Sequence, residues 1–203
     1  MNNIILIGAG GHAKSCVNLL ESQKKFKIIG FVDNKNKSFF NYSFLGKDKF
    51  LSEIRKKYKY AIISIGQIKN PKPRKLIYDK LIKLNFNLPT IISKHSLISK
   101  YSDIGESTLI FNHVFINTHV SIGSNCIINN KVNIEHDVAI GNNCHISTGA
   151  LINGNVDIGN NVFIGSGAII FNDCKIGDNV IVSGGSIIKK DIKKNTIIKW
   201  NLK

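Results

Sequence analysis

Isoleucine recurs at every sixth position from Ile92 to Ile188. Seventeen positions have this spacing, and Val182 is the one exception. An α-helix repeats its buried face about every 3.6 residues, and a half-buried strand repeats it about every 2 residues. A period of six fits neither element. It is typical of a solenoid whose repeat is a short straight segment followed by a corner.

A second period of eighteen residues runs through the same segment, so one turn of the solenoid has three faces. It is marked by glycines that each follow one of the isoleucines: Gly105, Gly123, Gly141, Gly159 and Gly177. A further column of small or β-branched apolar residues lies four positions after the isoleucines: Val114, Val120, Cys126, Val132, Val138, Cys144, Ala150, Val156, Val162, Ala168, Cys174 and Val180. These two columns fill a narrow interior, as hexapeptide-repeat β-helices require.

The residues between the straight segments are mostly Asn, Gly, Asp and His, of which Asn and Gly readily adopt the positive φ that a tight corner needs. We therefore predict a triangular prism of short parallel strands. The register is unbroken from residue 92 to residue 188, which leaves room for roughly five turns.

The composition changes near residue 90, which favours two domains, 1–90 and 91–203. The first part holds 18 Lys and Arg against 5 Asp and Glu, and the second holds 10 against 8. A basic first domain suits an anionic small molecule or a nucleic acid. Because 26 of the 28 basic residues are lysine and asparagine is abundant, a compositional bias of the genome is the simpler explanation.

The N-terminus has a four-residue apolar run, Ile4 to Ile7, without the basic lead and long apolar stretch of a signal peptide or membrane span. We expect a cytoplasmic protein that does not partner a membrane. Three of the four cysteines, Cys126, Cys144 and Cys174, fall in the inward column, where cysteine acts as a small apolar residue. Free thiols are expected in a reducing compartment.

The first ninety residues alternate strands and helices and predict a small parallel α/β sheet. We expect strands at 4–7, 27–32 and 60–65, and helices at 13–22, 49–57 and 73–84. Gly8, Gly10 and Ala13 satisfy G-x-G-x-x-A between the first strand and helix, and Asp33 ends the second strand. This is the dinucleotide-binding motif in its proper context.

An NAD-dependent enzyme is one interpretation of that motif. A full dinucleotide fold needs two mononucleotide-binding halves, however, and the chain enters the solenoid after about ninety residues. The glycines would still admit a phosphate to the helix N-terminus. A half-Rossmann domain that binds a nucleotide attached to another group fits better than NAD, and a tight turn beside a solvated Asp is the purely structural alternative.

The chain has six histidines, which are the first candidates for a catalytic group because imidazole titrates near neutral pH. His136 lies at a predicted corner between Glu135 and Asp137, and a neighbouring carboxylate can orient an imidazole and raise its basicity, as a general base requires. His145 precedes Ile146 and is expected to project outward from another face. A solvated turn histidine is the alternative for either residue.

Zinc binding is a weaker alternative. The gamma-type carbonic anhydrases are also hexapeptide β-helices and bind zinc through three histidines, but four residues separate their two close ligands. His113 and His119 are separated by five residues and occupy equivalent positions on adjacent faces. We therefore expect no metal.

Four segments together resemble a known family: GAGGHAKS at the start, GFVDN at the second strand, the ISIG turn, and IEHDVAIGNNCHIS in the solenoid. They are similar to the bacterial sugar acetyltransferases that join a small nucleotide-binding domain to a left-handed β-helix. This family includes sialic acid O-acetyltransferases and N-acetyltransferases of nucleotide-linked 4-amino-4,6-dideoxy sugars. The resemblance covers nearly the whole chain. It implies a nucleotide-sugar-binding domain at 1–90, an acyltransferase β-helix at 91–203, and acetyl-CoA as co-substrate.

The resemblance also implies roles for individual residues. His136 matches the general base, with Asp137 as the first choice for its supporting carboxylate and Glu135 as the second, and Asn129 matches the contact to the acceptor amine. The nucleotide-sugar pocket matches Gly10, Gly11, His12, Asp33, Asn34 and Gly66. Coenzyme A contacts match His145 and Gly184. The family forms homotrimers whose active sites lie between adjacent subunits, and a single prism filled with isoleucine offers no pocket of its own.

Two departures from the family pattern concern the ligands. Asp33-Asn34 stands where two acidic residues are frequent, and the chain ends in IIKWNLK without the family's Gly-x-Pro-Ala-Lys ending. We expect the adenine end of coenzyme A to be held differently, with Lys189 and Lys190 as candidates.

The predicted function is direct transfer of acetyl from acetyl-CoA to a sugar, with His136 as the base and a backbone N–H from a groove glycine stabilising the oxyanion. The repeat cysteines face the core, which argues against an acetyl-enzyme. N-acetylation of a UDP-linked 4-amino sugar is the first choice, and O-acetylation of sialic acid or a related sugar is the second. A non-catalytic binder of nucleotide sugars or nucleic acid, and an NAD-dependent oxidoreductase, are the alternatives from other classes. We expect no nucleic-acid partner.

Overall fold

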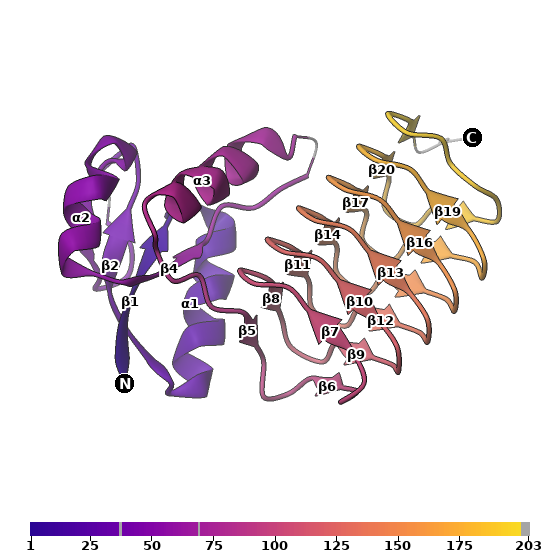
Figure 1. Cartoon of the computed structure of the whole chain (residues 1–203), viewed down its shortest axis with the longest axis horizontal. Helices are drawn as coiled ribbons and strands as arrows, with labels where there is room; N and C mark the ends of the chain where they lie inside the picture. Colours follow the sequence, from indigo (N-terminus) through magenta and orange to yellow (C-terminus); the bar gives the residue numbers. More distant parts are fainter. Residues whose placement is uncertain (37, 69, 200–203) are drawn as a thin grey trace. The chain divides into compact units, whose positions relative to one another are not determined.

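The computed structural model describes residues 1–36, 38–68 and 70–199, so Trp200 to Lys203 of the unusual C-terminal ending lie outside the described residues. The chain divides into two compact units (Figure 1). One comprises Met1–Gly66 and Lys72–Ile91, and the other comprises Gln67–Pro71 and Ile92–Lys203. The short segment Gln67–Pro71 therefore groups with the repeats, which the sequence pattern does not reveal.

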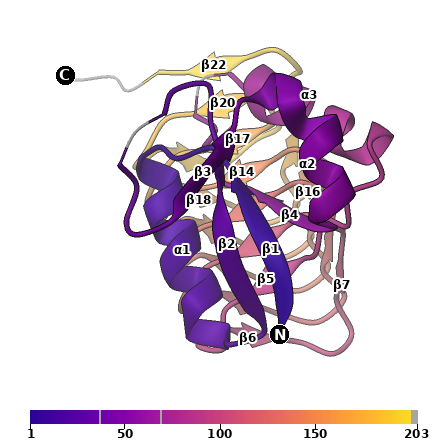
Figure 2. The same ribbon diagram turned by 90° about the vertical axis from the view of Figure 1, so that its left-hand side faces the viewer.

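The first unit is a four-stranded parallel sheet in the order β3-β2-β1-β4, with α1 on one face and α2 and α3 on the other (Figure 2). Its elements are β1 (Asn2–Ile7), α1 (Gly11–Gln23), β2 (Phe26–Val32), β3 (Ser43–Gly46), a 3-10 turn (Asp48–Phe50), α2 (Leu51–Lys57), β4 (Tyr60–Ile63) and α3 (Lys72–Lys83). β1 is central, and its apolar run Ile4 to Ile7 is fully buried, as a strand covered on both faces requires. The short strand β3 was not predicted, because its side chains are mostly half-buried and carry no clear alternation.

The second unit is a parallel β-helix whose strands are two residues long, as the period of six predicts (Figure 1). Its strands stack into three sheets, in the orders β19-β16-β13-β10-β7, β22-β20-β17-β14-β11-β8-β5 and β21-β18-β15-β12-β9-β6. The strands are β5 (Ile91–Ile92), β6 (Leu97–Ile98), β7 (Asp103–Ile104), β8 (Leu109–Ile110), β9 (Phe115–Ile116), β10 (Ser121–Ile122), β11 (Ile127–Ile128), β12 (Asn133–Ile134), β13 (Ala139–Ile140), β14 (His145–Ile146), β15 (Leu151–Ile152), β16 (Asp157–Ile158), β17 (Phe163–Ile164), β18 (Ile169–Ile170), β19 (Lys175–Ile176), β20 (Ile181–Val182), β21 (Ile187–Ile188) and β22 (Ile197–Ile198). Each strand pairs with the one eighteen residues away along most of the rod, for example Ile128 with Ile146.

The two predicted columns form the core of the β-helix from Ile110 onward, and Ile98 and Ile104 pack against it partly buried; Ile92, at the start of the predicted isoleucine column, is instead 37% exposed. Ile128, Ile146 and Ile164 have no exposed surface, and Cys126 and Cys144 of the second column are equally buried. The corners adopt left-handed backbone conformations at six-residue intervals, in positions such as Asn125 (φ 57°) and Asn143 (φ 57°). The interior and the corner chemistry predicted from the sequence are both confirmed.

The structure also explains the glycines spaced eighteen apart. A Cβ on Gly141 would lie 2.8 Å from the carbonyl carbon and oxygen of Gly159 in the next turn, and a Cβ on Gly105 would lie 2.6 Å from the carbonyl carbon of Gly123. Neither residue has a positive φ. Glycine is needed here because successive backbones touch at this corner.

Within the described residues, none of the helices has the length and apolar character needed to cross a membrane.

Replacing an inward isoleucine in mid-rod should destabilise the protein strongly. Ile158 is 1% exposed in β16. Ile158→Ala removes buried methyl groups and leaves a cavity, so we expect the free energy of unfolding to fall by about 2–5 kcal/mol. The matched control is Asp157→Ala, whose side chain is exposed on the same strand and should change that free energy by less than about 0.5 kcal/mol. Urea denaturation followed by circular dichroism measures both, and equal losses would contradict the assigned core.

Candidate functional site

The carboxyl ends of β1, β2 and β4 meet at one edge of the parallel sheet, the edge where α/β proteins bind ligands. Gly8 follows β1 with φ 101°, and a Cβ there would lie 2.7 Å from the Ile65 side chain, so only glycine fits the turn. Asp33 follows β2, and its Oδ2 accepts a hydrogen bond from the Ala9 N–H at 2.9 Å. The Asp33 carboxylate therefore ties the second strand to the glycine turn.

The predicted pocket residues are brought to this edge. Gly10 and Gly11 begin α1, and a Cβ on either would meet no atom within 4 Å. Gly66 follows β4, and its Cβ would lie 3.2 Å from the Cβ of His12, so these two residues face each other. Asn34 differs from the others, because its amide donates to the Asp48 carboxylate at 3.1 Å. The open surface over the two glycines is the place where a phosphate could approach the helix N-terminus.

Two residues that the sequence patterns did not single out hold this edge together. Ser64 Oγ lies 2.6 Å from the Gly8 carbonyl oxygen, which joins the turn after β1 to the end of β4. Arg74 of α3 is 1% exposed and donates through Nη1 to the carbonyl oxygens of Ile63 at 2.6 Å and Ile65 at 2.9 Å. The only signal was that Arg74 is one of two arginines in a lysine-rich chain. A guanidinium binds two acceptors in a fixed geometry that an ammonium does not reproduce.

His136 lies at an exposed corner after β12, with its side chain 53% exposed. Its Nδ1 lies 2.8 Å from Asp137 Oδ2, and because a carboxylate only accepts, Nδ1 is the donor. Asp137 has φ 60°, a left-handed conformation that Asp tolerates better than most residues. The contact leaves the Nε2 lone pair of a neutral imidazole available to take a proton.

Glu135 is held by other partners. Its Oε2 accepts from Asn117 Nδ2 at 2.8 Å, and its Oε1 accepts from Asn133 Nδ2 at 2.9 Å. The hydrogen bonds from Asn117 and then Asn133 lower the pKa of Glu135, with a smaller contribution from His136. Of the two carboxylates considered for His136, Asp137 is thus the one that binds its imidazole.

His145 does not project into solvent as expected from the sequence: it is 6% exposed. Its Nδ1 donates to the backbone carbonyl oxygen of Gln67, whose side chain in turn donates to the Asn143 carbonyl oxygen at 2.7 Å. The ring also packs edge-on against Phe163, with ring centroids 5.2 Å apart. Gln67 covers His145, and no local pattern in the sequence indicates that contact.

Asn129, the predicted contact to the acceptor, is linked to His145. With Nδ1 of His145 protonated, Nε2 is an acceptor, and Asn129 Nδ2 lies 3.5 Å from it. Asn129 Oδ1 accepts from the Asn130 N–H at 2.8 Å, so the amide orientation is fixed from both ends. Asn129 lies at the corner before β12 and His136 at the corner after it, so one chain does not bring them to the same corner.

The remaining histidines stack along two corners. The rings of His95 and His113 have centroids 6.0 Å apart, and those of Tyr101 and His119 have centroids 6.1 Å apart. Across the described part of the chain, no three His, Cys, Asp or Glu side chains are grouped so that they could hold a metal ion.

The four cysteines are buried, and none of them forms a disulfide within the described residues. Burial raises the pKa of the Cys16 thiol to about 12, although the charge of Arg74 acts in the opposite direction. Burial also raises the pKa of Cys144 well above its usual value. None of these thiols is placed or ionised as a nucleophile would be.

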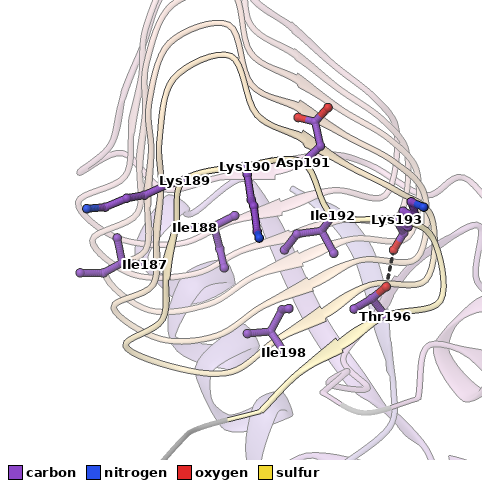
Figure 3. Close-up of a pocket in the computed structure, with 9 residues that line it drawn as sticks. All are labelled: Ile187, Ile188, Lys189, Lys190, Asp191, Ile192, Lys193, Thr196 and Ile198. Carbon is purple, nitrogen blue, oxygen red and sulfur yellow. Dashed lines mark hydrogen bonds between the residues drawn. The ribbon is translucent and has the colours of Figure 1, made fainter.

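A pocket of about 460 Å³ lies at the last described turn of the β-helix, among residues 187–198. Ile188, Ile192 and Ile198 point into it, whereas Lys189 points away, with its Nζ 5.3 Å from the Phe171 ring centroid (Figure 3). Lys190 also lines the pocket. A second pocket lies beside β16 and β19, and His136 lines neither of the two.

Gly184, the other predicted coenzyme A contact, follows β20, two turns beyond the β14 strand of His145. A Cβ on Gly184 would lie 3.0 Å from the Ser166 carbonyl oxygen. Its backbone thus packs closely against the preceding turn.

Comparisons with known proteins agree with both units. A model of the PglD N-terminal domain matches residues 3–81, and the bacterial transferase hexapeptide model matches residues 119–154 and 155–190. The chain is 29% identical over 111 residues to UDP-N-acetylbacillosamine N-acetyltransferase of Bacillus subtilis strain 168. That match takes in 54% of this chain and 51% of the relative, so the chain spans about half the length of the curated protein.

Solved structures match almost the whole chain. PerB from Caulobacter crescentus, in complex with CoA and GDP-perosamine, is 25% identical with a TM-score of 0.91, over 97% of this chain and 93% of that one. The acetyltransferase domain of PglB from Neisseria gonorrhoeae FA1090, in complex with acetyl coenzyme A, is 24% identical with a TM-score of 0.90, over 97% and 96%. The left-handed β-helix preceded by a Rossmann-like sheet is therefore the fold of this chain.

Asn117→Ala should raise the pKa of Glu135 toward its ordinary range, because Asn117 is the principal donor to the carboxylate. A carboxyl group whose pKa is lowered by folding stabilises the fold above its unfolded pKa, and this contribution is lost as the pH falls through the folded pKa. The variant should therefore lose about 1 kcal/mol or less at pH 7, and the difference from wild type should shrink in acid. Urea unfolding at pH 7 and in the acid range measures the difference in the free energy of unfolding between the variant and wild type.

The control for that experiment is the same substitution in a Glu135→Gln background, where no carboxylate remains to titrate. There, the effect of Asn117→Ala should not depend on pH. An equal pH dependence in both backgrounds would show that Asn117 does not act on Glu135.

Proposed function

We propose, starting from the matches to the PglD N-terminal domain and to the bacterial transferase hexapeptide repeats, that the chain transfers an acetyl group from acetyl-CoA to the amino group of a nucleotide-linked sugar. The observation that carries the proposal is the His136–Asp137 pair at an exposed corner of the β-helix. The named activities of the relatives support the same reaction: one acetylates a UDP-linked amino sugar, and another is solved with CoA and GDP-perosamine.

The reaction follows from the state of the His136 imidazole. With Nδ1–H bonded to Asp137, Nε2 accepts a proton from the sugar amine as its nitrogen attacks the thioester carbonyl carbon. The new C–N bond forms, the C–S bond breaks, and the proton passes from Nε2 to the departing thiolate of coenzyme A. Asp137 stabilises the imidazolium between these steps, and a backbone N–H of a corner glycine binds the oxyanion. The buried thiols give no route through an acetyl-enzyme.

The N-terminal unit would bind the nucleotide of the sugar acceptor. Gly10 and Gly11 leave the start of α1 open for a phosphate, and the Gly66–His12 contact and Asp33 lie at the same sheet edge. The other half of a dinucleotide fold is replaced by the β-helix, which favours a nucleotide sugar over NAD. A UDP-linked 4-amino sugar is the first choice of acceptor, with Asn129 as the contact to its amine.

Coenzyme A would lie along the β-helix, with His145 and Gly184 toward its pantetheine arm. Lys189 and Lys190 suit the phosphates of its adenosine end: Lys190 lines the C-terminal pocket, and the Lys189 ammonium lies over the neighbouring Phe171 ring. Ile134 and Ile188 are three turns apart on one face, roughly 14 Å at the spacing of stacked strands. This span is compatible with a co-substrate that reaches from His136 toward the lysines.

A homotrimer would complete the site. The outward positions of the β6-to-β21 sheet form an apolar strip of Leu97, Phe115, Leu151, Ile169 and Ile187, interrupted by Asn133. The equivalent positions of the β7-to-β19 sheet are Asp103, Ser121, Ala139, Asp157 and Lys175. An exposed apolar strip is typical of an interface. Since Asn129 and His136 lie at opposite edges of this strip, packing it against another copy would let residues of two chains share one site.

The proposed activity is tested by following free thiol release from acetyl-CoA with UDP-, dTDP- and GDP-linked amino sugars and with sialic acids. Wild type should turn over a nucleotide-linked amino sugar. His136→Ala should lower kcat/KM by about 10²–10⁴-fold, and Asp137→Asn, which keeps an acceptor for Nδ1–H without the charge, by less. Retention of kcat/KM within a few-fold by His136→Ala would disprove the assignment. Tight nucleic-acid binding without any thiol release would favour the non-catalytic alternative.

The proposed trimer is tested by sedimentation equilibrium of the 22.5 kDa chain. Wild type should have three times this mass, and Leu151→Lys should dissociate, because it places a charge in the apolar strip. Ser121→Lys makes the same change on the polar sheet and should leave the mass unaltered. A monomeric wild type, or equal dissociation by both variants, would contradict the assigned interface.

A further inference from the structure

Gly154 lies in the corner after β15, one turn beyond His136. A Cβ on Gly154 would lie 2.7 Å from Cε1 and 2.8 Å from Nε2 of the His136 imidazole. Non-bonded carbon atoms do not approach so closely, so the imidazole occupies the space that any other residue at position 154 would fill. The absence of a side chain at Gly154 therefore leaves the room that the ring occupies.

The backbone of Gly154 does not itself require glycine. Its φ is not positive, unlike that of Gly149 (φ 68°) or Gly167 (φ 65°), at which a Cβ would meet open space. The glycines spaced eighteen apart differ again, because their Cβ atoms would strike the backbone of the next turn. At position 154 the closest atoms belong to a side chain, that of His136.

The residues at this corner position in successive turns differ in side-chain size. It is occupied by Thr118, His136, Gly154 and Asn172, one per eighteen residues. The corners are tied by the Asn155 N–H, which donates to the His136 carbonyl oxygen at 3.0 Å, and by the Asp173 N–H, which donates to the Gly154 carbonyl oxygen at 3.2 Å. The turns thus stack directly, and the side chain at one turn faces position 154 of the next.

We propose that Gly154 is a positioning residue for the His136 imidazole, an inference that rests on the proposed acetyl transfer and on His136 as its base. Two features place the ring: the Nδ1 hydrogen bond to Asp137 sets its tautomer, and the missing side chain at Gly154 leaves open the space in which Nε2 lies. A methyl group at position 154 forces the ring to rotate. Because the His136 side chain is 53% exposed, the ring has room to do so at little cost in stability.

Rotation moves the proton acceptor and breaks the hydrogen bond to Asp137 without touching the residues that would bind either substrate. A displacement of about 1 Å at a reacting group can cost about 10²-fold in rate. We therefore expect Gly154→Ala to lower kcat by about 10–100-fold and to leave both KM values within about twofold of wild type.

The experiment is a double-mutant cycle of Gly154→Ala and His136→Ala, read by thiol release, thermal unfolding and NMR of the imidazole nitrogens. If Gly154 acts through the ring, Gly154→Ala lowers kcat in wild type but not in the His136→Ala background. The His136 signals, identified by their loss in His136→Ala, should shift in Gly154→Ala, and the Tm should stay close to that of the parent in both backgrounds. Gly154→Ser should give an equal or larger loss of kcat.

Three outcomes overturn the proposal: equal losses of kcat in the two backgrounds, unshifted His136 signals, or unfolding by Gly154→Ala in both backgrounds. The last would mean that the backbone itself needs glycine. If wild type releases no thiol with any acceptor, the proposed function fails. The NMR and unfolding measurements then still decide whether Gly154 holds the ring.

Discussion

The exact stacking of one turn on the next is the constraint on which the rest of the β-helix depends. Backbone N–H groups donate to carbonyl oxygens of the following turn, as from His145 to Val162 and from Phe163 to Val180, and no insertion interrupts the register. Along most of the rod, each position is therefore neighboured by the residues eighteen before and eighteen after it, and in the last described turn the spacing is sixteen, as from Ile181 to Ile197. Interactions at the surface follow this rule as strictly as the core does: Asn117 binds Glu135, and Asn155 binds Asp173.

This stacking separates the roles of three adjacent residues. Glu135 accepts hydrogen bonds from the amides of Asn117 and Asn133, which stabilise its ionised carboxylate and lower its pKa. Asp137 occupies the left-handed corner and turns back to the His136 imidazole. Asp137 thus orients the imidazole, whereas Glu135 binds two asparagines, although both acidic residues are next to His136 in the sequence.

Periodic features were predictable from the sequence because each is repeated many times and depends on the residue type and its position in the repeat. The isoleucine column, the inward cysteines and the left-handed corners follow from a register that a single residue would break. Features that depend on one distant partner were not predictable. His145 was expected to point outward and is covered by Gln67, 78 residues away, and the buried Arg74 has no periodic signal. The catalytic and binding roles assigned by resemblance remain predictions, since geometry alone does not test them.

The stacking also fixes the distances between groups along the rod as multiples of one turn. Groups on one face are separated by whole turns, each of roughly 4.8 Å, and cannot drift by less without breaking the ladder of backbone hydrogen bonds. Duplicating or deleting an eighteen-residue turn between Gly154 and the C-terminal lysines would move His136 and the lysines apart or together by one such step, while the turn that packs on the His136 corner stays in place. A chain of this kind can evolve its reach toward a long co-substrate in discrete increments, independently of the chemistry at the corner.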